Sequence, residues 1–160
     1  MALTGDVKAT RYGVGGNVHQ QLNLGLAATT TVYRGSIALK NASGYLKNSA
    51  SPLSTDTCMG LVEQALNIAN TGPGIVGTST NGAVLVDIAT GTFFLSAGTA
   101  GDALTIADIG SKVYVIDEVT VGKTDGSATR PVAGTLVAVD SSQPGGYAIK
   151  LGNFTGDTSP

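Results

Sequence analysis

The residues of this chain that come closest to offering chemistry are two adjacent acids, Asp117 and Glu118, in the stretch "KVYVIDEVTV". Two carboxylates can act as general acid and base when both face one cleft. Neighbouring residues on an extended strand point to opposite faces, so this pair shares no substrate unless a bulge intervenes. Acids at strand ends are usually solvated or hold a turn. We therefore interpret Asp117 and Glu118 as the break between two strand segments and expect no catalysis from them.

A nucleophile–base set or a metal site would have to use His19 or Cys58, the single histidine and the single cysteine of the chain. The G-x-S-x-G motif of serine hydrolases is absent, and a typical metal site needs several His or Cys ligands. One cysteine also allows no intrachain disulfide. We expect His19 to be an exposed or interfacial polar residue.

The glycine cluster "GVGGN" at residues 13–17 resembles a phosphate-binding loop only superficially. It follows no apolar strand, and Val18 stands where the dinucleotide fingerprint needs glycine. The acids at 102, 108, 117, 118 and 125 lack the spacing of a calcium-binding loop, which leaves at most a single weak cation site open. The sequence thus predicts no enzyme activity, no cofactor and no metal.

Charged residues form only 12% of the 160-residue chain, and the formal net charge is -2. The sequence has no basic tract that would bind nucleic acid or an anionic membrane surface. No apolar run approaches the roughly 18 residues of a membrane span, and the first residues lack the apolar region of a signal peptide. The composition favours folding in a cytoplasm and association with itself or another protein, because so little charge keeps the surface monomeric.

The elements that must position these residues are short strands joined by glycine-rich turns, as 23 glycines and the absence of tryptophan indicate. The pattern predicts a hairpin over 30–47 and the strongest strand over 83–96. Residues 59–70, "MGLVEQALNIAN", fit a helical face as well as strand alternation, and the strands on both sides favour a strand. One face of the strongest strand carries Val84, Val86 and Ile88. Further strands are expected over 112–116, 120–121, 132–139 and 146–151.

Residues 1–30 differ from the rest of the chain. Val18, Leu22, Leu24 and Leu26 alternate with polar residues, and this spacing suits an extended segment better than a helix. The segment is either an N-terminal arm that becomes ordered on a partner or a first strand of the domain itself.

We predict an all-β fold, a small β-barrel or sandwich-like domain with an extended N-terminal arm. In this interpretation the arm spans residues 1–30 and the β-barrel-like domain spans residues 31–152. Residues 153–160 form a loose C-terminal tail.

The order of several sequence pieces resembles a family of tailed-phage structural proteins, the capsid cement or head-decoration proteins. The pieces are "VYRGSIALKNASGYL", "MGLVEQALNIANTGPGIVG", "VLVDIATGTFFL" and "ADIGSKVYVIDEVTVGKTDGSATRPVAGTLVAVD". They cover about residues 30–151, and none is a catalytic motif. The family typically carries basic residues before the glycine that corresponds to Gly91, and "DIATGTF" has none there.

The resemblance implies a small β-barrel-like protein without enzymatic activity, made in the bacterial cytoplasm and bound to the outer capsid surface of the virion. It implies the major capsid protein and further copies of the chain itself, as a homotrimer, as partners, with no nucleic acid and no membrane. We expect the partner interface in the arm and on the strand before the acids: Tyr12, Val18, His19, Leu22, Leu24, Leu26, Tyr114 and Ile116.

The alternative is a receptor- or glycan-binding component of a phage fibre or spike, because small β-domains host many functions. A fibre protein would typically carry internal repeats or a coiled-coil stem, and the sequence has neither.

Overall fold

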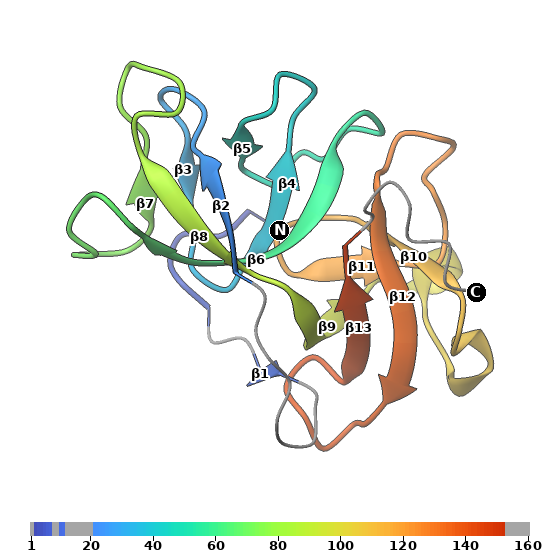
Figure 1. The fold of residues 1–160 in the computed structure, drawn as a ribbon. Coiled ribbons are helices and arrows are strands. Elements are labelled where there is room, and N and C mark those ends of the chain that lie inside the picture. Colours follow the sequence, from blue (N-terminus) through green and yellow to red (C-terminus); the bar gives the residue numbers. More distant parts are fainter. Residues whose placement is uncertain (1, 8–9, 12–20, 153–160) are drawn as a thin grey trace.

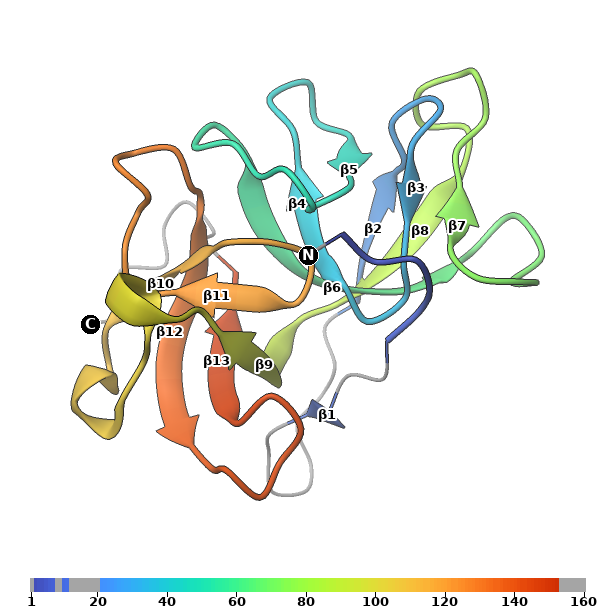
Figure 2. The same cartoon turned by 180° about the vertical axis from the view of Figure 1, so that it is seen from behind.

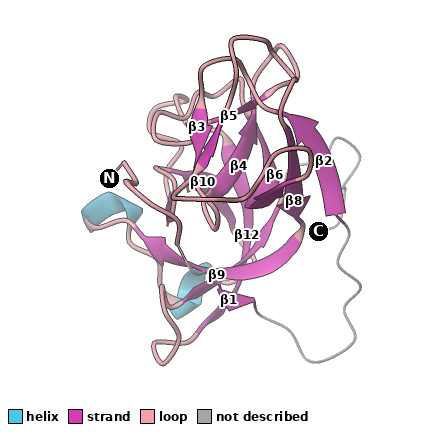
Figure 3. Cartoon of the chain, turned by 90° about the vertical axis from the view of Figure 1, so that its left-hand side faces the viewer, coloured by secondary structure: helices cyan, strands magenta, loops and turns pink. Residues whose placement is uncertain are grey.

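Short β-strands joined by turns make up nearly all of the chain in the computed structural model, which describes residues 2–7, 10–11 and 21–152 (Figure 1). The two helices of the described residues are single 3-10 turns, η1 at Ala100–Asp102 and η2 at Ile106–Asp108 (Figure 3). The all-β prediction is therefore confirmed. The strands are β1 Thr10–Arg11, β2 Gln21–Gly25, β3 Thr31–Val32, β4 Ile37–Lys40, β5 Leu46–Lys47, β6 Thr57–Ala65, β7 Ile75–Val76, β8 Leu85–Ala89, β9 Gly91–Ala97, β10 Lys112–Val115, β11 Thr120–Gly122, β12 Val132–Val139 and β13 Tyr147–Leu151.

Five strands close into a small barrel. They pair in the order β9-β11-β10-β12-β13, and a further pairing between β13 and β9 completes the ring. The β9–β11 pair is parallel, and the other four pairs are antiparallel. Side chains that alternate inward along these strands fill the interior: Phe93, Leu95, Val113, Val115, Val121, Leu136, Ile149 and Leu151.

A second sheet packs against the barrel, with strand order β2-β8-β6-β4-β5. β8 and β9 follow one another with only Thr90 between them, so this stretch of chain leaves the sheet and enters the barrel. One face of the sheet contributes Ile37, Leu39 and Leu61 to the barrel's core cluster. A second core cluster joins the opposite face of this sheet to the β3–β7 pair and the adjoining turns: Leu26, Val32, Ala38, Leu46, Val62, Ala65, Ile75, Val84, Val86 and Ile88.

The ambiguous segment 59–70 is a strand up to Ala65, as the strands on both sides had favoured. A helix here would bury only one stripe of side chains. In the structure Leu61 belongs to the barrel core, whereas its neighbour Val62 belongs to the second core. Alternation between two cores is what an extended chain provides and a helix does not.

Cys58 lies on β6 with no exposed surface. Burial raises the pKa of its thiol to about 12, so at pH 8 its thiolate population falls about 1,000-fold below that of an ordinary cysteine. We predict that native protein resists a thiol reagent at pH 8, whereas protein in concentrated urea reacts within the mixing time of a standard assay. Rapid labelling of the native protein would show that β6 is not held in the core as described.

Candidate interaction site

The adjacent acids Asp117 and Glu118 are buried rather than solvated. Glu118 is 1% exposed and Asp117 is 7% exposed. Asp117 does hold the expected turn, since its Oδ1 accepts a hydrogen bond from the Val119 N–H at 3.0 Å. Burial alone would raise the pKa of Asp117, but hydrogen bonds, including those from Val119 and Thr120, hold it below its ordinary value. Of the two expected alternatives, solvation or a turn, the structure shows the turn for Asp117.

Glu118 joins three segments that are far apart in the sequence. Its Oε1 accepts a hydrogen bond from Asn48 Nδ2 at 2.8 Å, and its Oε2 accepts one from the Leu3 N–H. Its main-chain oxygen accepts the Ile37 N–H at 2.8 Å. A buried carboxylate is tolerated when its oxygens are bonded in this way. Glu118 is therefore a structural junction between the barrel, the second sheet and the first residues of the chain.

The described N-terminal segment, residues 2–7, runs across the junction between the barrel and the sheet of β4 (Figure 2). Asp6 Oδ1 accepts N–H bonds from Arg34 at 2.8 Å and from Gly74 at 3.1 Å. Asp6 Oδ2 pairs with Arg34 Nη1 at 2.6 Å. Burial alone would raise the pKa of Asp6, but these donors and the Arg34 charge lower it. Because the segment also satisfies Glu118, removing it would disturb the body of the protein.

Gly35 is the residue that lets the N-terminal segment approach so closely. A Cβ at this position would lie 2.1 Å from the Val7 carbonyl oxygen, and the backbone has a φ of +80°. Any other residue at this position would be strained, because its Cβ would clash with Val7 and its backbone would have to adopt a positive φ. The Val7 N–H in turn bonds the Arg34 carbonyl oxygen at 2.8 Å.

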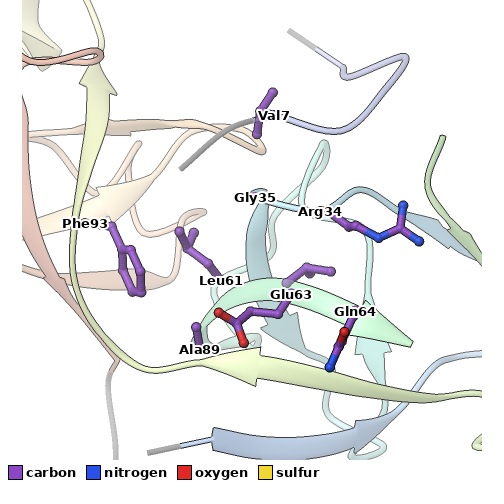
Figure 4. A pocket seen from close by; sticks show the side chains of 9 residues that line it. Val7, Arg34, Gly35, Leu61, Glu63, Gln64, Ala89 and Phe93 are labelled. Atoms are coloured by element: carbon purple, nitrogen blue, oxygen red, sulfur yellow. The ribbon is translucent and has the colours of Figure 1, made fainter. Parts of the chain in front are cut away.

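A pocket of about 400 Å³ lies beside this segment (Figure 4). Val7 closes one side, Glu63 and Gln64 enter from β6, and Phe93 lines it from β9. In Figure 4 the Glu63 carboxylate extends toward Ala89, at the end of β8. The described lining residues include no Ser, Thr, Cys, His or Tyr that could act as a nucleophile. The pocket mixes apolar surface with one carboxylate, one amide and one guanidinium.

Asp87 on β8 is a buried acid that is only partly satisfied. It is 3% exposed, and its Oδ1 has no hydrogen-bond partner. Burial and the charge of Glu63 raise its pKa, although a hydrogen bond with the Gln64 side chain opposes them.

We predict that Asp87→Asn stabilises the protein at pH 7 by about 1–3 kcal/mol, because it removes a buried negative charge that lies near the charge of Glu63. The folded-state pKa of Asp87 lies above its ordinary value, so the ionised form costs stability at neutral pH. That cost disappears as the pH falls below the ordinary carboxyl range. The gain from Asp87→Asn should therefore shrink toward zero in acid, as urea unfolding at several pH values would reveal.

Asp140 is the matched control for this prediction. Hydrogen bonds from the side chain and main chain of Ser142 lower its pKa, against a smaller effect of burial. Its ionised form therefore favours the folded state above the ordinary carboxyl pKa. Asp140→Asn should shift stability at pH 7 in the opposite direction from Asp87→Asn. A gain from Asp87→Asn that persists unchanged in acid would contradict the assignment.

The predicted interface residues separate into four groups. Tyr12, Val18 and His19 lie outside the described residues. Leu22 and Leu24 on β2 are half-buried against the second core cluster.

Leu26 is fully buried in the second core and is therefore not a partner-contacting residue in this conformation. Residues 21–25 form a strand of the domain itself, which was the alternative to a partner-binding arm, because β2 pairs with β8 along its whole length. Period-two spacing indicated an apolar face but gave no sign that the chain's own second core would cover it.

Tyr114 and Ile116 are half-buried at the barrel. The Ile116 Cδ1 lies against the backbone at Gly98 and Gly122, where an added Cβ would come within 2.7 Å of it. Ile116 therefore already packs closely against its own chain. Tyr114 on β10 keeps some exposed surface.

Exposed apolar residues that the sequence analysis missed lie elsewhere. Leu66 directly follows β6 and Leu85 begins β8, and their side chains are 44% and 41% exposed. The Leu66 N–H donates a hydrogen bond to the Leu85 carbonyl oxygen, so the two residues lie together at one end of the β6–β8 pair. Ile109 and Val137 are exposed on the barrel, at 45% and 36%. Within a strongly apolar sequence such residues give no local signal, because only the fold decides which apolar side chains are left outside.

The acids at 102 and 108 form ion pairs rather than a calcium site. Asp102 pairs with Arg130 at 2.9 Å, and Asp108 pairs with Lys123 at 2.6 Å. Among the described residues, no group of three or more His, Cys, Asp or Glu side chains could hold a metal ion. The described part of the chain also contains no helix long and apolar enough to cross a membrane.

The fold and these surfaces identify the chain only as a small all-β protein, in which a second sheet packs on a five-stranded barrel. Comparison with known proteins adds no family: no family model, no curated protein and no solved structure matches the chain.

Proposed function

We propose that this chain is a non-enzymatic structural protein of a tailed phage, which binds the outer surface of the assembled capsid and stabilises it as a cement protein. The observation that carries the proposal is the fold. The sequence pieces that resemble capsid cement proteins, over about residues 30–151, form the barrel and the sheet packed on it. The resemblance implied a small β-barrel of this kind.

The surroundings of the acidic residues support a structural role. Asp117 holds a turn, and Glu118 joins distant segments of the fold. Asp102 forms an ion pair with Arg130, and Asp108 forms one with Lys123. Each of these four carboxylates therefore has a structural task.

The physical mechanism of a cement protein requires only preferential binding. A protein that binds the assembled shell and not its separated subunits stabilises the shell by mass action. A homotrimer that contacts several capsid subunits at once gains further from effective concentration, so each contact can be weak. The low charge of this chain suits broad, flat protein contacts of this kind.

An add-back experiment tests the proposal. Particles of the phage that encodes this chain would be prepared from a deletion strain, and purified protein would be added and sedimented with them. We expect the protein to co-sediment with particles, not with isolated capsid subunits, and to raise the temperature at which particles release DNA. Protein that remains in the supernatant at saturating concentration would overturn the proposal.

A further inference from the structure

The net charge of -2 conceals two exposed lysines without an ion pair on one face of the barrel, in the described part of the chain. Of the cations whose side chains the structure describes, Arg34, Lys47, Lys123 and Arg130 each pair with an aspartate. Several acids are withdrawn from the surface as well, since Asp87, Asp117 and Glu118 are buried. Among the described residues, the exposed charge is therefore more positive than the composition indicates.

Two of the cations without an ion pair in the described part of the chain lie in one row across the barrel. Lys112 on β10 is the direct partner of Thr135 on β12, and Thr135 is the direct partner of Lys150 on β13. Directly paired residues on neighbouring strands project from the same face of a sheet. Both lysines are exposed, and two strand spacings place their backbones about 10 Å apart. We call Lys112, Thr135 and Lys150 the lysine row.

Exposed apolar side chains flank the lysine row. Val137, which follows Leu136 at a β-bulge of β12, is 36% exposed. Ile109 is 45% exposed, and the chain that follows it runs beside β12, with the Gly110 N–H bonded to the Leu136 carbonyl oxygen at 2.8 Å. Unpaired cations beside exposed aliphatic groups fit a protein surface that offers carboxylates beside an apolar patch.

We propose that the outer face of β10, β12 and β13 is a docking surface for an acidic protein surface, held by the lysine row and by Val137 and Ile109. The inference rests on the proposed function, in which that acidic surface belongs to the exterior of the capsid. Two lysines neutralise too few phosphates for appreciable binding to nucleic acid, and the flanking aliphatic residues favour a protein partner.

Charge reversal tests the docking surface. The variant Lys112→Glu/Lys150→Glu should bind particles from the deletion strain about tenfold or more weakly than the natural protein, and raising the salt should weaken the natural protein more than the variant. Lys40→Glu is the matched control, because Lys40 on β4 also lacks an ion pair in the described part of the chain but lies on the other sheet. It should bind within about twofold of the natural protein. Circular dichroism and thermal unfolding would establish that all three proteins are folded.

The outcomes separate this inference from the proposed function. If the natural protein does not bind particles, the proposed function fails. If it binds, and the double variant binds equally well with the same salt dependence, the docking surface is wrong while the proposed function stands. Equal losses for the double variant and for Lys40→Glu would also overturn the inference, because they would indicate general electrostatic attraction. Tight binding of the natural protein to duplex DNA, lost in the double variant, would replace the protein partner by nucleic acid.

Discussion

Replacing Asn48 with alanine will lower the free energy of unfolding by about 3 kcal/mol, since it leaves a buried carboxylate without one of its donors. Asn48 Nδ2 donates to Glu118 Oε1 at 2.8 Å and to the Thr31 carbonyl oxygen at 2.8 Å, and Glu118 is 1% exposed. Equilibrium unfolding in urea at pH 7 would measure the loss.

A double-mutant cycle isolates the bond to the carboxylate from the other bonds of Asn48. Glu118→Gln keeps the shape of the side chain and removes its charge. Asn48→Ala should therefore cost less by about 1 kcal/mol or more in the Glu118→Gln background than in the natural protein. The bonds of Asn48 to Thr31 and Ala50 are lost equally in both backgrounds. Equal costs in the two backgrounds would show that Glu118 does not depend on Asn48.

Gly134→Ala is the second substitution with a large expected effect. A Cβ at this position would lie 1.9 Å from the Lys150 carbonyl oxygen, which belongs to the neighbouring strand β13. Backbone cannot yield as a flexible side chain can, so β12 and β13 would have to separate locally. Because these strands are also needed to close the barrel, we expect a loss of about 3 kcal/mol.

Gly101→Ala provides the matched control for Gly134→Ala. Nothing lies within 4 Å of a Cβ at Gly101, and its φ lies outside the left-handed region. The substitution should leave stability unchanged or raise it slightly, because it reduces the freedom of the unfolded chain. Both variants would be compared by urea unfolding under one set of conditions. Equal stability of the two would contradict the close approach of β12 and β13.

The strands could be predicted from the sequence where alternation is strong. Val84, Val86 and Ile88 are buried in the second core, as their spacing indicated. The choice between barrel and sandwich could not be made in advance, because it depends on whether β13 pairs with β9. That pairing joins residues far apart in the sequence, and no local pattern specifies it.

The fate of the acid pair could not be predicted for the same physical reason. An acid between two strands is solvated unless the fold supplies donors, and the donors of Glu118 come from positions 70 and 115 residues away. The composition alone also did not indicate where unpaired positive charge lies on the surface. The lysine row becomes visible only once the structure shows which aspartates pair with the other cations.

Copy number in purified particles tests the central claim most directly. Quantitative mass spectrometry would compare this chain with the major capsid protein in particles of the phage that encodes it. A cement protein requires a count comparable to that of the capsid subunits, and we predict that result. A handful of copies per particle would indicate a fibre, vertex or receptor-binding component instead, and complete absence from particles would contradict a role in the virion.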